Sequence, residues 1–191
     1  MRRKEALVKD IQIADWVQKI AGERAPLKDL REWEHRIVAA YSELLEGYQT
    51  DTGAILNDIA RVREHPGLVL EQGINFTSIC YHHFLPFYGT IDVAYEPSEV
   101  ITGLGRIVEL VQALAHRFQI QEFLVRDIAE TIRERVGAKG VFVRSRAVHL
   151  CVHSRGPSDH TMETVCTYAV GSFRPVERQA ELSQLLAMKA R

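Results

Sequence analysis

The 191-residue sequence lacks most features that mark secreted, membrane or nucleic-acid-binding proteins. It has only three cysteines, odd in number and widely spaced, which excludes a disulfide framework and favours a reducing compartment. No apolar run is long enough to span a bilayer, and polar sequence follows the basic start Met1-Arg2-Arg3-Lys4 in place of the apolar part of a signal peptide. We therefore expect a cytoplasmic protein with no membrane partner.

Neither sign of charge is in excess, because 24 lysines and arginines stand against 25 aspartates and glutamates, a formal net charge of -1. A surface for nucleic acid built on bulk positive charge is therefore not expected, and an anionic ligand must be bound by cations gathered locally. Hydrophobic residues make up 46% of the chain and charged residues 26%, which is typical of a soluble globular protein with one main core.

The spacing of apolar residues predicts helices first and then a mixture of strands and helices. Helical periods cover residues 6–21, 27–45, 107–118, 123–136 and 176–189, with a further turn or two within 54–63. Strand patterns cover residues 68–71, 87–95, 141–153 and 163–173. This order predicts an α+β fold with antiparallel strands, divided into an N-terminal helical region at 1–65 and a catalytic region at 66–191.

The sequence is organised around a dense group of metal-ligating side chains at Cys80-Tyr81-His82-His83. Cys80 and His83 are three residues apart, so a turn of helix or a tight loop lets both face one point while His82 is turned aside. Two ligands are too few for zinc, which takes three protein ligands and a water in catalytic sites, or four protein ligands in structural sites. A further ligand must come from elsewhere in the chain.

The strand predicted at 141–153 supplies one. Alternate side chains of a strand share a face, which puts Ser145, His149 and Cys151 on the same side. Cys166, in another apolar strand with no neighbour of ligand type, is interpreted as a core residue.

Cys80, His83 and Cys151 then form a Cys2His set for zinc with one position open for water. His82 and His149 remain for acid and base catalysis beside the metal. Two alternatives stay open: a purely structural zinc site with His82 or His149 as the fourth ligand, and thiols that are only small core residues.

Several segments of the chain resemble GTP cyclohydrolase I, the zinc-dependent type, in the same order from about Leu30 to Phe173. They are Cys80-x-His82-His83-x-Leu85-Pro86-Phe87-x-Gly89, Ala94-Tyr95-x-Pro97, Gln119-Ile120-Gln121-Glu122, His149-x-Cys151 and Arg155-Gly156. The resemblance implies the tunnelling fold (T-fold), in which antiparallel sheets backed by helices join between subunits into a β-barrel. It also implies a homo-oligomer, with a decamer favoured and active sites between subunits.

The reaction implied by the resemblance belongs to pterin and tetrahydrofolate biosynthesis. The imidazole ring of GTP is opened by hydrolysis at C8, formate is released, and the product is 7,8-dihydroneopterin triphosphate. By position in the motifs, the zinc ligands are Cys80, His83 and Cys151, and the proton-transfer residues are His82 and His149. The substrate-binding residues are Gln121, Glu122 at the guanine edge, and Arg36, Arg106 and Arg155 at the triphosphate.

The segment expected to bind phosphate departs from the family pattern. Where the family usually has Gly-Leu-Ser-Lys with an arginine three residues later, this chain has Gly103-Leu104-Gly105-Arg106 and then Glu109. A carboxylate here repels a triphosphate unless Arg106 or Arg117 neutralises it. Two other hypotheses therefore stand beside GTP hydrolysis. One is the same zinc chemistry on a nucleoside, a monophosphate or another purine, and the other is a non-catalytic paralogue that keeps the zinc and acts as a binding or regulatory subunit.

Overall fold

The computed structural model describes residues 13–22, 27–62 and 67–187, which fall into two compact units. The N-terminal unit, Met1–Leu45, contains α2 (Ile13–Ala21) and α3 (Leu27–Leu44), which pack against each other. Both helices were predicted, although residues 6–12 of the first prediction lie outside the described residues. None of the described helices is both long enough and apolar enough to cross a membrane.

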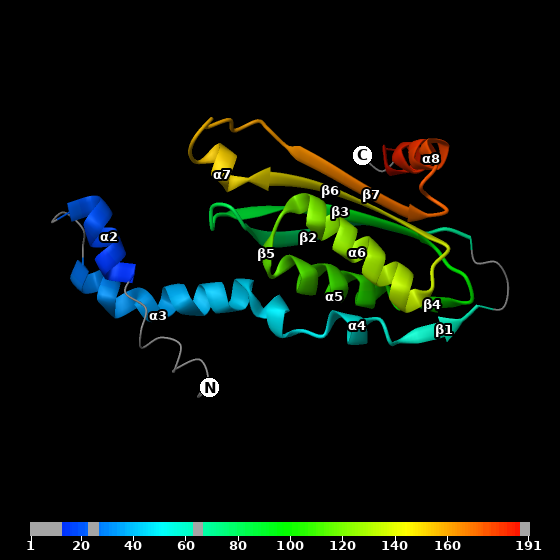
Figure 1. The fold of residues 1–191 in the computed structure, drawn as a ribbon, viewed down its shortest axis with the longest axis horizontal. Helices are drawn as coiled ribbons and strands as arrows, with labels where there is room; N and C mark the ends of the chain where they lie inside the picture. The colour runs from blue at the N-terminus through cyan, green and yellow to red at the C-terminus, as the bar shows by residue number, and fades with distance from the viewer. Residues whose placement is uncertain (1–12, 23–26, 63–66, 188–191) are drawn as a thin grey trace. The chain divides into compact units, whose positions relative to one another are not determined.

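The C-terminal unit, Glu46–Arg191, is built on a five-stranded sheet (Figure 1). Its strands lie in the order β5 (Phe118–Gln119), β2 (Val69–Cys80), β3 (Pro86–Glu96), β6 (Gly140–His149) and β7 (Thr164–Gly171). Neighbouring strands are antiparallel except β5, which pairs in parallel with the end of β2. A separate pair joins β1 (Ile59–Arg61) to β4 (Val100–Thr102). The predicted α+β class with antiparallel pairing is thereby confirmed.

Helices cover both faces of this sheet (Figure 1). The helices of the unit are η2 (Glu46–Gln49), α4 (Thr52–Ile55), α5 (Leu104–Ala115), α6 (Gln121–Val136), α7 (Leu150–His153) and α8 (Val176–Ala187). Because strand side chains alternate, Val93 and Val143 face a large core with α5 and α6, whereas Ala94 and Phe142 face a small core under α8. A sheet packed on both faces is a rigid support for groups carried at its ends.

Three predicted elements differ from the structure. Of the predicted helix at 54–63, residue 63 lies outside the described residues and only residues 54 and 55 belong to α4; β1 follows as a strand because it pairs with β4. The strand predicted at 68–71 continues to Cys80, because β2 pairs with β3 along its length around a bulge between Glu71 and Ile74. The strand predicted at 141–153 ends at His149, where α7 begins.

The two compact units divide between Leu45 and Glu46, earlier than the boundary predicted at residue 65. Residues 46–62 belong with the sheet because they are tied to its helices and strands. The backbone N–H of Gly47 donates to the His116 carbonyl at 3.0 Å, and β1 pairs with β4.

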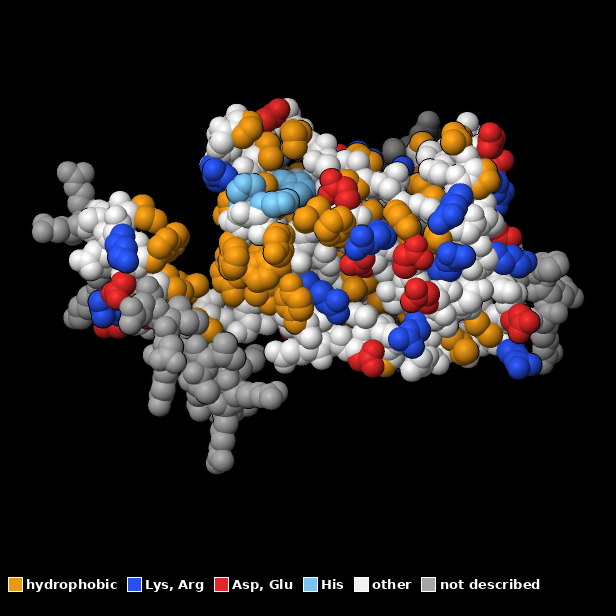
Figure 2. All heavy atoms as spheres, viewed as in Figure 1, with side chains coloured by type: hydrophobic (Ala, Val, Ile, Leu, Met, Phe, Trp, Pro, Cys, Tyr) orange, Lys and Arg blue, Asp and Glu red, His pale blue; other side chains and the backbone are white. Residues whose placement is uncertain are grey.

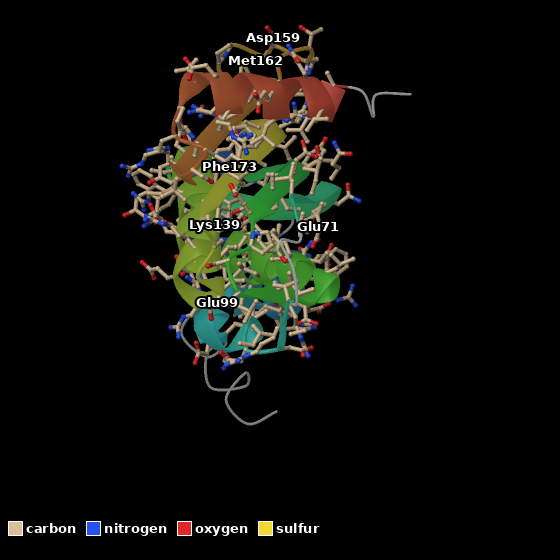
Figure 3. The ribbon with its side chains drawn as sticks, turned by 90° about the vertical axis from the view of Figure 1, so that its right-hand side faces the viewer. Glu71, Glu99, Lys139, Asp159, Met162 and Phe173 are labelled. Atoms are coloured by element: carbon tan, nitrogen blue, oxygen red, sulfur yellow. The ribbon has the colours of Figure 1, made fainter. Side chains whose placement is uncertain are left out.

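Glu71 lies beside the bulge of β2 and is labelled in Figure 3. Its Oε1 is buried, and none of the described residues donates a hydrogen bond to it. Desolvation by burial raises the pKa of this carboxyl from its ordinary 4.5 to about 7. The folded chain therefore holds a proton at Glu71 that the unfolded chain releases at lower pH.

The variant Glu71→Gln is expected to remove a pH-dependent loss of stability. Between pH 4.5 and about 7 the folded state binds this proton and the unfolded state does not, so the stability of the unaltered chain falls as the pH rises through this window. A glutamine has no proton to lose. The Tm of Glu71→Gln minus that of the unaltered chain should therefore increase between about pH 5 and pH 8 in calorimetry.

The exposed Glu99, also labelled in Figure 3, provides the matched control. Glu99→Gln removes the same charge without removing a buried carboxylate. An equal pH dependence of the Tm difference in both variants would contradict the assignment to burial of Glu71.

Candidate active site

The turn between β2 and β3 forms one side of the site. Cys80, the last residue of β2, is 5% exposed, and its N–H donates to the Leu85 carbonyl at 2.9 Å. Its own carbonyl accepts from the N–H groups of His83 and Phe84 at 3.3 and 3.0 Å. Phe84 has a φ of 57°, rare for a bulky residue, and its ring lies 4.3 Å from that of Phe118. These contacts close a tight turn around the Cys80 thiol.

Both histidines of this turn are beside the thiol. The Nδ1 atom of His83 is 3.7 Å from Sγ of Cys80, and the Nδ1 atom of His82 is 4.0 Å from it. The expectation that His82 is turned aside is therefore wrong, because the tight turn closed on the Cys80 carbonyl leaves both imidazoles within 4.0 Å of the thiol. The distance to His83 is close to the roughly 3.6 Å that separates nitrogen and sulfur ligands around a tetrahedral zinc ion.

The end of β6 forms the other side of the site. Because β3 lies between β2 and β6, the paired residues Phe87 and His149 bring the end of β6 next to the turn. Cys151 follows in the first turn of α7, so it does not share a strand face with His149 as predicted. Even so, Cys80, His149 and Cys151 each have one ligand atom within 4.8 Å of the other two. His83 is not part of this group.

Burial controls the protonation of the groups on this side. It lowers the pKa of the His149 imidazole, an effect that the Glu122 carboxylate opposes and His153 reinforces. It also raises the pKa of the Cys151 thiol, with Cys80 acting in the same direction and Arg155 opposing it. Glu122 and Arg155 are therefore close enough to the site to act on its groups electrostatically.

Gln121, the first residue of α6, is 2% exposed and makes three hydrogen bonds. Its Nε2 donates to Oγ of Ser145 at 2.8 Å and to the Thr164 carbonyl at 3.0 Å. Its Oε1 lies 2.7 Å from Nε2 of His149, whose ring stacks on Phe87 at 4.6 Å and 3°. Sequence reasoning missed these supports, although the position of Ser145 on the face of His149 was an available signal.

Arg106, predicted to bind phosphate, lies at the opposite end of α5 from the cluster. Cys80 pairs with Gln119, which follows the C-terminal end of that helix, whereas Arg106 is in its first turn. The 12 residues of α5 span about 18 Å. Arg106 forms ion pairs with Glu109 at 2.7 Å and with Asp58 at 3.5 Å. The neutralisation of Glu109 by Arg106 is thus seen in the structure.

Arg36, also predicted to bind phosphate, lies on α3 in the N-terminal unit. Its guanidinium carbon lies 5.6 Å from the centre of the Trp33 ring, a cation–π contact.

The donor set fits a zinc ion. Thiols and imidazoles are the ligands zinc prefers, whereas magnesium and calcium take oxygen ligands. Both sulfur atoms belong to buried residues, and the histidines of the turn are exposed. Figure 2 shows histidine side chains gathered in one patch of the surface, bordered by hydrophobic side chains. A metal held here would be supported by the core and accessible to a ligand.

These features define an α+β protein with a candidate metal centre of cysteines and histidines at one end of an antiparallel sheet. Residues 12–187 match the family model of GTP cyclohydrolase I. The GTP cyclohydrolase 1 of Campylobacter lari is 40% identical over 160 residues, 84% of each chain. That of Bacteroides fragilis is 33% identical over 170 residues, 89% of this chain and 88% of its own.

The GTP cyclohydrolase 1 of Fusobacterium nucleatum is 37% identical over 146 residues, 76% of this chain and 78% of its own. Among solved structures, the apo form of the archaeosine synthase QueF-Like aligns at 18% identity and a TM-score of 0.46, covering 57% of this chain and 98% of that chain. The match of the family model and the identities to the curated relatives show that the chain belongs to the GTP cyclohydrolase I family. It is an enzyme of that type, a hydrolase.

Zinc content of alanine variants will identify the ligands. Cys151→Ala is expected to lose both zinc and activity, because a thiolate ligand is removed from the set. His83→Ala is expected to lose zinc as well, whereas His149→Ala should lose activity and keep the metal. The metal is measured by mass spectrometry of purified protein, as ions per chain.

Cys166→Ala is the matched control, because Cys166 is a free thiol outside the group of mutually close ligand atoms. It should keep its zinc. Equal zinc loss from His149→Ala and Cys151→Ala, with zinc retained in His83→Ala, would show that His149 is the imidazole ligand.

Proposed function

We propose that the protein is a zinc-dependent GTP cyclohydrolase that opens the imidazole ring of GTP at C8 and releases formate. The observation that carries this proposal is the family match over residues 12–187, joined to the convergence of Cys80, His149 and Cys151. The antiparallel sheet backed by helices is compatible with the tunnelling fold that family membership implies.

Cys80, His83 and Cys151 are the proposed zinc ligands. The distance of 3.7 Å between the sulfur of Cys80 and Nδ1 of His83 supports this set. His149 is the alternative imidazole ligand, since one of its ring nitrogens lies within 4.8 Å of both sulfur atoms and its hydrogen bond to Gln121 occupies only Nε2. Zinc in such a site acts as a Lewis acid and lowers the pKa of a water molecule to about 7.

His149 is the proposed proton carrier of the hydrolysis. Because burial lowers its pKa, the imidazole is neutral near pH 7 and can accept a proton from the attacking water. It can then return this proton to the purine nitrogen as the bond between C8 and nitrogen breaks. His82, whose Nδ1 is 4.0 Å from the Cys80 sulfur, is the second proposed proton carrier.

Glu122 is proposed to select guanine. A carboxylate accepts two hydrogen bonds, so it matches the two N–H donors on the edge of a guanine base. Glu122 is exposed and acts electrostatically on His149, so a base bound to it would lie beside the proton carrier. Gln121 has its side chain engaged with protein groups, and its contribution to substrate binding is proposed to pass through His149.

Arg155, Arg106 and Arg36 are the proposed triphosphate contacts, and their arrangement favours an oligomer. Arg155 is near the cluster, whereas Arg106 is separated from Cys80 by the length of α5. One chain therefore does not bring Arg106 to its own zinc ligands. A second copy would supply it, in a homo-oligomer for which the family resemblance favours a decamer.

Mixed oligomers test this arrangement. Arg106→Ala and Cys151→Ala are each expected to be nearly inactive alone. When the two are coexpressed in equal amounts, roughly a quarter of the sites should combine an intact Arg106 with an intact Cys151 from different copies. Activity is measured per mole of oligomer after purification through two different affinity tags. Mixtures as inactive as the parent variants would contradict a site shared between copies.

Turnover of GTP, GMP and guanosine tests the proposed substrate. The zinc-loaded protein is incubated with each compound, and formate release is followed together with pterin fluorescence after oxidation. The expected result is formate and pterin from GTP. Formate from guanosine or GMP alone would overturn GTP as the substrate, and no product from any purine by zinc-loaded protein would favour a non-catalytic paralogue. A Cys151→Ala sample is the control for contaminating enzyme.

The surroundings of Arg106 favour a second candidate, the same chemistry on a purine without a triphosphate. Two carboxylates, Glu109 and Asp58, pair with this one guanidinium, so the local charge is negative. Gly105 adds no hydroxyl that could donate to a phosphate. A nucleoside or a monophosphate would not need the cations that these residues neutralise or lack.

Glu109→Gln distinguishes the two candidates. If GTP phosphates lie near Arg106, loss of the Glu109 charge should lower the KM for GTP about fivefold with little change in kcat. Glu181→Gln is the matched control, because Arg178 and Glu181 form an ion pair at the same helical spacing in α8. An unchanged KM for GTP in Glu109→Gln would count against a phosphate site at the start of α5.

A further inference from the structure

The orientation of the Gln121 side-chain amide follows from its hydrogen-bond partners. The oxygen and nitrogen of an amide are told apart only by what surrounds them. A backbone carbonyl can only accept, so the atom 3.0 Å from the Thr164 oxygen must be the NH2 group. The same nitrogen donates to Oγ of Ser145 at 2.8 Å. The remaining atom, Oε1, therefore faces His149.

This orientation determines where the hydrogen of His149 lies. Oε1 of Gln121 can only accept, so the contact of 2.7 Å to Nε2 of His149 requires a hydrogen on Nε2. A neutral imidazole carries one N–H, and its other nitrogen has the free lone pair. In this site the lone pair is consequently on Nδ1.

The ring is also fixed in direction. The Phe87 ring covers one face of the His149 ring at 4.6 Å, with the two planes 3° apart. Turning the imidazole over would remove its nitrogen from Gln121 and leave a buried amide oxygen without a partner, which costs about 1–3 kcal/mol. Phe87 and His149 are partners in the register of β3 and β6, so the stack is maintained by the sheet.

The hydrogen bonds of Gln121 do more than fill space in the core. Ser145 is fully buried and Gln121 nearly so, and both face the apolar core between the sheet and α6. A leucine of similar size would fill the place of Gln121 without needing partners. The amide joins α6, β6 and β7, and its only acceptor atom is directed at the histidine with the proposed catalytic role.

We propose that Gln121 is a positioning residue that holds His149 in the Nε2–H tautomer and so makes Nδ1 the atom that accepts and returns protons in the reaction. The proton leaves the attacking water, binds Nδ1, and is transferred to the purine nitrogen as the ring opens, while the hydrogen on Nε2 stays bound to Gln121. The imidazole begins and ends each cycle neutral. This inference rests on the proposed function of His149 for its kinetic part only.

A neutral acceptor behind the histidine has a further consequence. A carboxylate in this place would stabilise the imidazolium form and make the ring a poorer proton donor to the purine. Gln121 directs the tautomer without adding a charge.

The tautomer is measured directly by nitrogen-15 solid-state NMR of histidine-labelled, zinc-free protein, with the His149 signals identified by comparison with His149→Asn. The unaltered chain should show a protonated Nε2 and a bare Nδ1 at pH 8. In Gln121→Leu both tautomers should appear, because the acceptor for Nε2–H is gone. A protonated Nδ1 in the unaltered chain would overturn the proposal whatever the variant does.

The kinetic arm uses GTP turnover. Gln121→Leu should lower kcat about 30-fold and leave KM for GTP within about threefold, since the side-chain amide of Gln121 is engaged with Ser145, Thr164 and His149. Gln121→Glu, which still accepts from Nε2–H, should recover part of this loss and keep one tautomer. An unchanged kcat in Gln121→Leu would contradict the positioning role.

Gln119→Leu controls for placing an aliphatic chain at a buried glutamine. Gln119 is 7% exposed, and its Nε2 donates to the Leu114 carbonyl at 2.9 Å, away from His149. Gln119→Leu should lower the Tm by about as much as Gln121→Leu does, but it should leave the tautomer of His149 unchanged. If the unaltered protein does not turn over GTP, the proposed function fails, and the NMR result still decides the tautomer.

Discussion

The register of β3 between β2 and β6 is the constraint on which the site depends. Ile79 pairs with Pro86 on one side, and Phe87 pairs with His149 on the other. This pairing sets the thiol of Cys80 and the imidazole of His149 at the same end of the sheet, although 69 positions separate them in the chain. A slip of one residue would turn each strand's core side chains to the opposite face. The large core against α5 and α6 therefore fixes the geometry of the candidate metal centre as well as the fold.

A buried hydrogen-bond network positions the histidine at the end of β6. Gln121 and Ser145 lie at the edge of an apolar core, and their hydrogen bonds are satisfied within it. A satisfied buried network is rigid, because moving one member leaves the others without partners. The histidine at the end of β6 is thereby held by three elements at once. The turn of His82 and His83 is more exposed, which suits the roles proposed for these two histidines.

Many of the helices and strands, and the motif at Cys80, could be predicted from the sequence because their patterns lie within short stretches of chain. The helical periods of α3, α5 and α6, the alternation in β3 and the motif at Cys80 all lie within short windows. The change from β6 to α7 could not be predicted in this way, because Leu150–His153 continues the apolar alternation of the strand. The hydrogen bonds of Gln121 do not appear in any short window of sequence, since Ser145 and Thr164 are 24 and 43 positions away.

The two halves of the proposed substrate site depend on different parts of the molecule. The proposed zinc ligands and proton carriers are positioned by the ends of β2 and β6 and by the start of α6. Arg106 and Glu109 are set by the start of α5, at the other end of a helix of about 18 Å. A substitution at Glu109 can therefore change the charge seen by a phosphate without moving His149 or Cys80. This separation explains how the chain can keep the cysteines and histidines of the family motifs while its proposed phosphate segment departs from the family pattern. The charges at the start of α5 are exposed and can change, whereas the positions of the proposed catalytic groups are fixed by the core.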